Sequence, residues 1–288
     1  MADMADIAGQ TGSTGPGDAP PVCPRHTNRV SYVRCQRCSR PTCPACQVPS
    51  AVGVHCVDCA ASARAQRRQV RTVLGGSVVS DALVTKVLIG ACVLAYVVQL
   101  AMPSLAGRFH FVPALAVAQP WRFVTTALLH GSLMHLAFNM WALWVLGNAL
   151  EPVLGRWRFA SLTALSAVGG STAVYWLASP SSPATWFGGT VGASGAVFGL
   201  FAALFIIQRR FGRDTSAIVG LLVVNIVVSF IGANISWQGH LGGLVTGGLL
   251  AAVYAWAPRE RRTLYGVAGT AGVAVLLLAL IVLRASLV

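Results

Sequence analysis

Charged side chains are scarce in this sequence. Asp, Glu, Lys and Arg together make up 10% of the 288 residues, whereas hydrophobic residues make up 55%, and the mean hydropathy is +0.67. So few charges leave too little polar surface to cover a soluble globule of this length. The composition therefore excludes a soluble globular protein and predicts a protein embedded in a membrane.

Acidic residues are the scarcer kind of charge. The chain has 8 Asp and Glu against 21 Lys and Arg, a formal net charge of +13. A basic balance of this size can indicate nucleic-acid binding, but here the arginines form short clusters beside apolar runs and do not alternate with aromatic residues. We therefore expect no nucleic-acid partner, and we interpret the clusters as marks of membrane topology.

Cysteine is nearly absent outside one short segment. Seven of the eight cysteines lie between Cys23 and Cys59, in the motifs CPRH, CQRC, CPAC and CVDC. These are four pairs of potential ligands, each with two residues between its members, and together they supply two closed tetrahedral zinc sites. If the four ligand pairs alternate between the two sites, the zinc ions cross-link a segment that is too short to form a hydrophobic core. This alternation assigns Cys23, His26, Cys43 and Cys46 to one site, and Cys35, Cys38, Cys56 and Cys59 to the other.

A disulfide cluster is the alternative for these cysteines. The preceding residues have neither a basic start nor an apolar core, so they do not resemble a secretory signal, and disulfides are rare in the reducing cytoplasm.

Closed zinc sites leave no position for a substrate, so the expected zinc is structural. His55 is a further candidate ligand, although a surface histidine is the simpler interpretation. The spacing resembles cross-brace zinc modules of the B-box type, and we expect the module to recruit a cytoplasmic partner or to regulate the protein.

Seven long apolar runs follow, each near the ~20 residues that cross a bilayer. Arginines follow the second, fourth and sixth runs and precede the first, whereas the loops 179–193 and 234–237 contain no Lys or Arg. The positive-inside rule predicts a multi-pass protein of the cell membrane with a cytoplasmic amino terminus and an external carboxyl terminus. The predicted spans are residues 83–102, 133–151, 157–178, 194–211, 215–233, 238–257 and 264–284.

These features divide the chain into five parts. We expect a disordered tail at residues 1–21, a zinc-binding module at 22–62, a basic linker at 63–82, a six-span core at 83–257, and a cytoplasmic loop with a seventh span at 258–288. The predicted fold class is an all-α, polytopic membrane helix bundle with a small amino-terminal zinc-binding domain.

Polar side chains within the predicted spans gather near their outer ends. Ser194 begins the fourth span and His240 lies near the start of the sixth, while His130 precedes the second. His135 and Asn139 share one face of the second span, because they are four residues apart. Taken singly, the glycines beside Ser194 and His240 fit small-residue helix contacts, and the other side chains fit hydrogen bonds between helices. Together they place more polarity at one depth than helix packing requires.

Ser194 and His240 are a potential nucleophile and base. The sequence offers no carboxylate at their depth, because Asp214 lies in a cytoplasmic loop and Glu151 at the inner end of the second span. A Ser–His pair can still hydrolyse a peptide bond if the histidine first removes the hydroxyl proton and then protonates the leaving amine. Phe198 lies one helical turn after Ser194, so its ring can support the imidazole.

Three motifs, GASG, HGSLMHLAFN and GHLGGLVTG, resemble the signature of the rhomboid intramembrane serine proteases, over residues 83–257. The resemblance implies a six-span rhomboid core, with the seventh span similar to the extra helix of some members. It implies catalytic roles for Ser194 and His240, no catalytic cofactor, and single-pass transmembrane substrates cut near the outer face. The family's loop and second-span motifs are matched by Trp121, Arg122, Gly147, Glu151 and Gly155.

Attack of the serine on a peptide carbonyl develops an oxyanion, which hydrogen-bond donors near Ser194 must stabilise. The candidate donors are His135, Asn139 and the backbone N–H of Ser194 at its helix start. Gly192 lets backbone and substrate approach closely. His130 matches a family position that we interpret as structural.

Two positions depart from the family pattern: Phe198 stands where tyrosine is frequent, and Gly239 where alanine is frequent. Neither difference removes a reacting group.

Two other functions stay open. An inactive relative that binds or escorts membrane proteins would usually lack the serine or the histidine, and this chain has both. A transporter with a histidine proton relay would spread polar residues through the membrane depth.

Overall fold

The computed structural model describes residues 19–66, 72–76, 81–231 and 235–288. The chain divides into two compact units, Met1–Gln69 and Val70–Val288, and each is described by itself. Most of the predicted disordered tail and part of the basic linker lie outside the described residues.

The smaller unit contains two short antiparallel strand pairs and one helix. Three of its buried residues, Cys23, Cys43 and Cys46, form its hydrophobic cluster. So small a core cannot by itself stabilise a unit of this size. The strands are an exception to the predicted all-α class. Its elements are β1 (Val22–Cys23) paired with β2 (His26–Val30), β3 (Gln47–Pro49) paired with β4 (Val54–Cys56), and α1 (Val57–Gln66).

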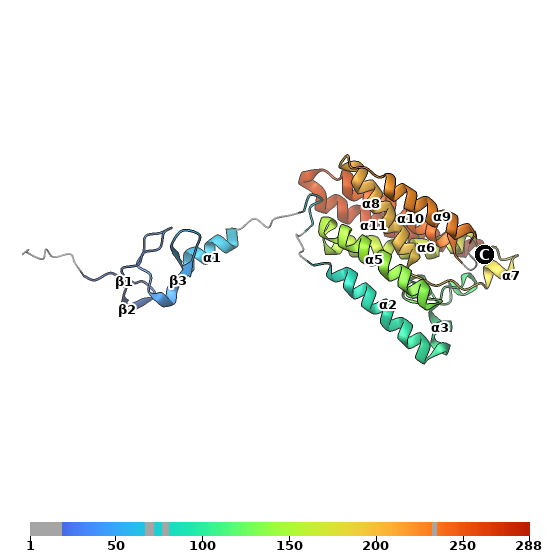
Figure 1. The fold of residues 1–288 in the computed structure, drawn as a ribbon, viewed down its shortest axis with the longest axis horizontal. Coiled ribbons are helices and arrows are strands. Elements are labelled where there is room, and N and C mark those ends of the chain that lie inside the picture. Colours follow the sequence, from blue (N-terminus) through green and yellow to red (C-terminus); the bar gives the residue numbers. More distant parts are fainter. Residues whose placement is uncertain (1–18, 67–71, 77–80, 232–234) are drawn as a thin grey trace, which may run out of the picture. The chain divides into compact units, whose positions relative to one another are not determined.

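The larger unit is helical (Figure 1). Seven of its described helices coincide with the seven predicted spans, with ends that differ by at most three residues. Shorter helices occupy the loops. The long helices are α2 (Leu83–Ala101), α5 (Leu133–Leu154), α6 (Arg156–Leu177), α8 (Ser194–Arg210), α9 (Ser216–Ile231), α10 (Trp237–Trp256) and α11 (Arg262–Leu287).

Three segments among the described residues are long and apolar enough to cross a membrane by length and composition: Leu83–Ala101, Leu133–Leu154 and Arg259–Leu287. Ser216–Phe230 is a shorter apolar helix. The remaining long helices, α6, α8 and α10, are rich in small residues because their faces contact other helices. The structure therefore supports a multi-pass helical membrane protein, and the count of seven spans stays a prediction.

Glycines bring α8 and α10 into backbone contact. A β-carbon added at Gly243 of α10 would collide with the backbone of Gly195 of α8, and one added at Gly247 would collide with Gly199. Near the start of both helices, a β-carbon at Gly195 would lie 3.3 Å from the carbonyl oxygen of Gly239. Side chains larger than hydrogen would separate the two helices at these points. This contact brings the first turn of α8 to the first turn of α10.

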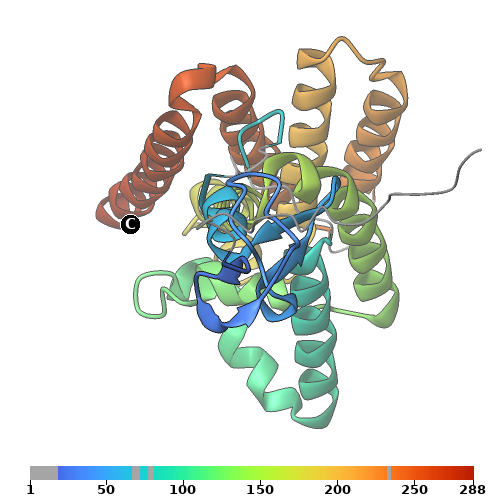
Figure 2. The same ribbon diagram turned by 90° about the vertical axis from the view of Figure 1, so that its left-hand side faces the viewer.

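Hydrogen bonds fasten α11 to α6 and α10. The indole Nε1 of Trp176 donates to the Leu280 carbonyl at 3.0 Å, and Arg284 Nη2 donates to the Ala178 carbonyl at 2.7 Å. The hydroxyls of Tyr254 and Thr270 lie 2.6 Å apart. Figure 2 shows α11, in red, on the other side of the larger unit from α9. The last helix is therefore integral to the bundle but distant from α9.

Glu151 caps α2 from the end of α5. Its buried carboxylate accepts hydrogen bonds from the backbone N–H groups of Val84 and Thr85, both at 2.9 Å, and from the Thr85 hydroxyl at 2.8 Å. Gly147, one turn earlier, leaves room for the Thr85 side chain. The second-span motif Gly147–Glu151 thus joins α2 to α5.

We predict that Glu151→Ala lowers the free energy of unfolding by roughly 3 kcal/mol, because it leaves two buried donors of Thr85 and the partly buried N–H of Val84 without an acceptor. The midpoint of thermal unfolding in detergent measures the change. Glu260→Ala, which removes an exposed carboxylate, is the control and should leave the midpoint unchanged. Equal midpoints for both variants would contradict the capping role.

Candidate active site and metal-ligand groups

Ser194 is the first residue of α8 and is half-buried. The preceding turn contains Gly192, whose φ of +129° is a conformation that side-chain-bearing residues rarely adopt. A helix's first N–H groups have no partner within the helix and lie at the positive end of its dipole. The chain therefore presents a hydroxyl and a backbone donor at one point.

The loop before Ser194 is held by the segment that precedes α5. Phe111 and Thr190 exchange two backbone hydrogen bonds, at 3.0 and 2.8 Å. The Thr126 hydroxyl donates to the Thr190 carbonyl at 2.6 Å, and Gly192 N–H donates to the Thr126 carbonyl at 3.0 Å. These bonds fix the entry of the chain into α8.

The segment before α5 is itself ordered by Arg122, which is buried in α4 (Arg122–Thr125). Its guanidinium donates to the Gln119 side-chain oxygen at 2.7 Å and to the Gly107 carbonyl at 3.0 Å, and it also donates to the His110 carbonyl. The indole of Trp121 donates to the Arg108 carbonyl at 3.2 Å. The Trp–Arg pair therefore organises the loop and does not reach Ser194.

His240 stacks on Phe198. The ring centroids are 4.1 Å apart and the rings are nearly parallel, at 11°. Because Phe198 is one turn beyond Ser194 in α8, this stack places the imidazole on the Ser194 side of α10. In the described residues no hydrogen bond joins Ser194 to His240; such bonds often form only when substrate is bound.

A further side-chain contact of His240 comes from Ser229 of α9, a residue that the sequence analysis did not single out. Ser229 Oγ lies 2.6 Å from His240 Nδ1. A single serine in an apolar helix has no spacing signature, so its partner is visible only in the folded chain.

The His135 ring lies beside Gly192. A β-carbon added at Gly192 would lie 2.8 Å from His135 Nε2 and 3.6 Å from Ser194 Oγ. Gly131 N–H donates to His135 Nδ1 at 3.4 Å, so the hydrogen of the neutral ring belongs on Nε2. Ser132 caps the helix by accepting from the His135 backbone N–H at 3.1 Å. The ring therefore directs a donor toward the space beside Ser194.

Asn139 and His130 are placed differently. The Asn139 Nδ2 donates to the His135 carbonyl of its own helix at 2.9 Å, which uses one of its two amide hydrogens. His130 is buried, and its ring meets the His135 ring edge to face, with centroids 5.2 Å apart. Its backbone is held by Gln99 of α2, which accepts from the His130 N–H at 3.0 Å and donates to its carbonyl at 3.1 Å. Gln99 is a further residue that sequence reasoning missed, and its only signal is a lone amide in an apolar span.

A cavity of about 100 Å³ lies between α9 and α10 beside His240. Apart from Ser229 and the imidazole, its walls are apolar. They include Phe198, Ile226, Phe230 and Leu244.

No carboxylate serves His240 within the described residues. Glu151 caps α2, as described above. Asp214 accepts from the Ser216 N–H at 3.0 Å and from its hydroxyl at 2.7 Å, and these bonds hold the pKa of Asp214 below its usual range. At 1.5 Å per residue, Asp214 lies roughly 20 Å along α9 from Ser229.

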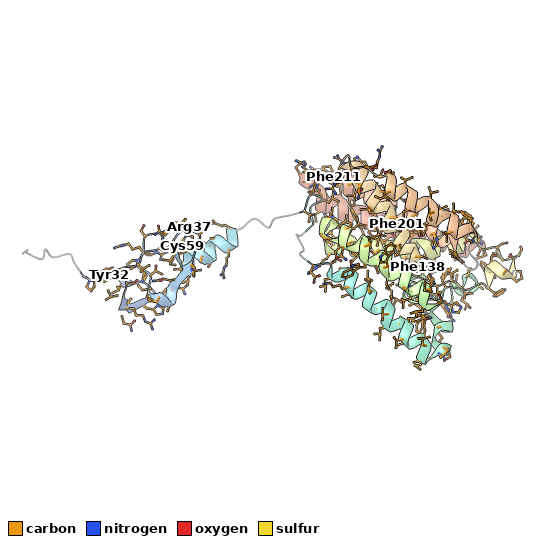
Figure 3. The ribbon with its side chains drawn as sticks, viewed as in Figure 1. Tyr32, Arg37, Cys59, Phe138, Phe201 and Phe211 are labelled. Carbon is orange, nitrogen blue, oxygen red and sulfur yellow. The ribbon has the colours of Figure 1, made fainter. Side chains whose placement is uncertain are left out.

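The smaller unit assembles two groups of four potential metal ligands. They have the memberships predicted from the spacing, and the ligand atoms of each group lie within 4.8 Å of one another. Figure 3 shows the unit's side chains, with Cys59 labelled. The groups are Cys23, His26, Cys43 and Cys46, and Cys35, Cys38, Cys56 and Cys59.

The distances within these groups suit tetrahedral zinc. Bonds of about 2.3 Å from zinc to sulfur separate two ligand sulfurs by about 3.8 Å. Cys38 and Cys56 have sulfurs 3.8 Å apart, and His26 Nδ1 lies 3.3 Å from the sulfurs of both Cys43 and Cys46. All eight cysteines lie in the described residues and none forms a disulfide, and His55 belongs to neither group.

Comparison with known proteins agrees with a helix bundle in a membrane. A family model described as "Rhomboid domain" matches residues 117–257. Over 147 residues the chain is 37% identical to the putative rhomboid protease YdcA of Bacillus subtilis (strain 168), a match that covers 49% of this chain and 70% of YdcA. The chain belongs to the rhomboid family, a family of intramembrane serine proteases.

Other relatives are matched over smaller shares of their length. The rhomboid protease GluP of Bacillus subtilis (strain 168) is 35% identical over 150 residues, which are 50% of this chain and 28% of GluP. The rhomboid protease GlpG of Salmonella newport (strain SL254) is 29% identical over 191 residues, 62% of this chain and 65% of GlpG. The family model begins after the cysteine-rich unit.

We predict that Gly192→Ala lowers the free energy of unfolding by about 1–3 kcal/mol, because the methyl group meets the His135 ring and the positive φ is strained. Thermal unfolding in detergent measures this. Gly131→Ala is the matched control, since a β-carbon there would meet nothing closer than 3.8 Å. A Gly192→Ala midpoint equal to that of the control would contradict the packing described.

Proposed function

We propose that this chain is an intramembrane serine endopeptidase that cuts transmembrane segments of single-pass proteins near the outer face of the membrane. The observation that carries the proposal is the stack of His240 on Phe198, one turn beyond Ser194, at the glycine contact of α8 and α10. This arrangement supports a pairing of the imidazole with the hydroxyl at the start of α8. Its polar groups gather at one end of the helices, which favours a protease over a transporter with a proton relay.

The chemistry follows from these groups. Ser194 Oγ attacks the scissile carbonyl carbon while its proton passes to His240 Nε2, and the imidazolium then protonates the leaving amine. A water molecule repeats the sequence to release the acyl group and to regenerate the serine hydroxyl. No metal or cofactor takes part in these steps.

The developing oxyanion requires donors that are already in place. His135 Nε2–H, the backbone N–H of Ser194 and the second amide hydrogen of Asn139 supply them. His135 has the strongest structural support, because its ring and the Ser194 hydroxyl flank Gly192. Gly192 keeps the space between them open, and the buried His130 supports the His135 ring from below.

Substrates are expected to be membrane helices that can unwind. A helical backbone has its peptide groups hydrogen-bonded internally, so a scissile bond becomes accessible where Gly or Pro weakens the helix. The apolar cavity beside His240 is suited to an apolar substrate side chain. The clustering of polar side chains at one end of the spans favours cleavage near the outer face.

The proposed topology has six spans in the rhomboid core and a seventh span formed by α11. The arginine clusters orient the amino terminus to the cytoplasm and the carboxyl terminus to the outside.

We further propose that the smaller unit is a B-box-like module with two structural zinc ions, one for each group of four ligands. Hydrogen bonds, foremost that from the backbone N–H of Cys43, lower the pKa of Cys23 to about 6, which favours the thiolate that zinc requires, whereas burial and the neighbouring thiols raise the pKa of Cys46 to about 11. Closed sites of this kind stabilise a fold without taking part in catalysis, and the module is suited to recruiting a cytoplasmic partner.

Reconstitution with a generic helical substrate tests the protease. Ser194→Ala and His240→Ala should each abolish cleavage, because they remove the nucleophile and the base, whereas Ser161→Ala, at a serine of α6 that bonds its own helix, should cleave like wild type. Cleavage products are followed by mass spectrometry. Full activity of either dyad variant would exclude the mechanism, and an inactive wild type would favour the escort function.

Metal analysis of the full chain, purified without chelator, tests the module. We expect about two zinc ions per chain. Cys35→Ser should reduce the content to about one, whereas Cys92→Ser, at the cysteine of α2, should leave it unchanged. A chain without zinc, or an equal loss in both variants, would contradict the assignment.

A further inference from the structure

Ser229 is the only residue of α9 that the surrounding protein buries, among residues 216–230, whose burial the structure describes. Its exposed fraction is 4%. Helices that present one buried face normally bury apolar side chains there. Here the single buried side chain is a hydroxyl, which requires a polar partner to offset its loss of water.

Two hydrogen-bond partners lie within reach of this hydroxyl. Ser229 Oγ is 2.7 Å from the carbonyl oxygen of Asn225, four residues earlier in α9, and 2.6 Å from His240 Nδ1. The bond to Asn225 alone would satisfy the hydroxyl, as serines in membrane helices commonly do. The contact with His240 is therefore additional to what burial demands.

The position of the hydrogens follows from counting donors. A serine hydroxyl has one hydrogen and two acceptor positions, and a backbone carbonyl can only accept. The hydroxyl hydrogen therefore lies toward the Asn225 oxygen. The short contact with His240 is then a hydrogen bond only if Nδ1 carries a hydrogen and donates it to Ser229 Oγ. A neutral imidazole protonated on Nδ1 has its lone pair on Nε2.

We propose that Ser229 is a positioning residue, which holds His240 in the Nδ1–H tautomer and so keeps Nε2 ready to accept the Ser194 proton. This inference rests on the proposed function, since it assigns a role to a residue that does not touch substrate. The step remains balanced: Nε2 gains the Ser194 proton, while Nδ1 keeps its hydrogen bond to Ser229 in the neutral ring and in the imidazolium.

A second contact between α9 and α10 lies next to this hydrogen bond. Beside Ser229, the Phe230 ring stacks on Trp237 of α10, with centroids 5.3 Å apart and an angle of 26°. Ser229 and Phe230 also line the cavity beside His240. The helix that borders the proposed substrate space thus also sets the tautomer of the base.

Nitrogen-15 NMR of the histidine rings tests the proposal in the full chain, in detergent and in a Ser194→Ala background. In a sample whose imidazole is neutral, His240 should show an Nδ1 that bears hydrogen and an Nε2 that does not; loss of these signals in His240→Gln assigns them. Ser229→Thr, which keeps the hydroxyl, should preserve the pattern, whereas Ser229→Ala should shift the hydrogen toward Nε2. Val228→Ala, at an exposed neighbour in α9, is the control.

Kinetics with Ser194 intact give the second measurement. The kcat of Ser229→Ala should fall by roughly tenfold, the effect of losing one hydrogen bond of about 1.4 kcal/mol, with KM changed less than twofold. Ser229→Thr should recover most of kcat. Because a loss of folded protein also lowers the apparent kcat without changing KM, kcat is expressed per folded enzyme, with the folded fraction of each variant measured by thermal unfolding; a loss of stability alone then leaves this kcat at the wild-type value.

A wild-type His240 with its hydrogen on Nε2, or tautomers that are equal in wild type and Ser229→Ala, would overturn the proposal. The NMR result does not depend on cleavage. If the wild type cleaves nothing, the proposed function fails while the tautomer assignment is still decided. If cleavage requires Ser194 and His240 but Ser229→Ala keeps the wild-type kcat, only the role of Ser229 fails.

Discussion

Direct backbone contact between α8 and α10 is the constraint on which the candidate site depends. Gly195, Gly199, Gly243 and Gly247 remove the side chains that would hold the helices apart. Helix association in a membrane draws little on the hydrophobic effect, so close packing of small residues provides much of the attraction. The close contact of the two helices that stabilises the bundle also brings the start of α8 to the start of α10, where His240 lies. The glycine contact therefore serves both the stability of the bundle and the geometry of the candidate site.

The polar groups around His240 are neutral, and this has a physical reason. A carboxylate in this apolar environment would carry a large desolvation cost unless it were paired, as Glu151 is paired with three donors at the start of α2. An aromatic stack and a hydroxyl hold the imidazole at a lower cost. The proposed base is thus oriented by packing and one hydrogen bond, where soluble serine proteases use an aspartate.

Much of the fold could be predicted from the sequence because the signals are local. Apolar run length and arginine position predicted helices whose ends differ by at most three residues from those observed. Ligand pairs separated by two residues predicted both groups of four in the smaller unit. Ser229 and Gln99 escaped prediction because neither belongs to a spaced polar motif in its apolar helix. The partner of each, His240 or His130, lies at a sequence distance that no periodicity specifies.

The sequence by itself determined the membrane helices, the family and the identities of the candidate groups, since these depend on composition, run length and motif spacing. Only the tertiary structure decided which groups meet. It put the His135 ring beside Ser194 across Gly192, committed one amide hydrogen of Asn139 to its own helix, and brought Ser229 to His240. These placements depend on how closely helices approach and rotate against each other, a property of packed side chains from several segments at once.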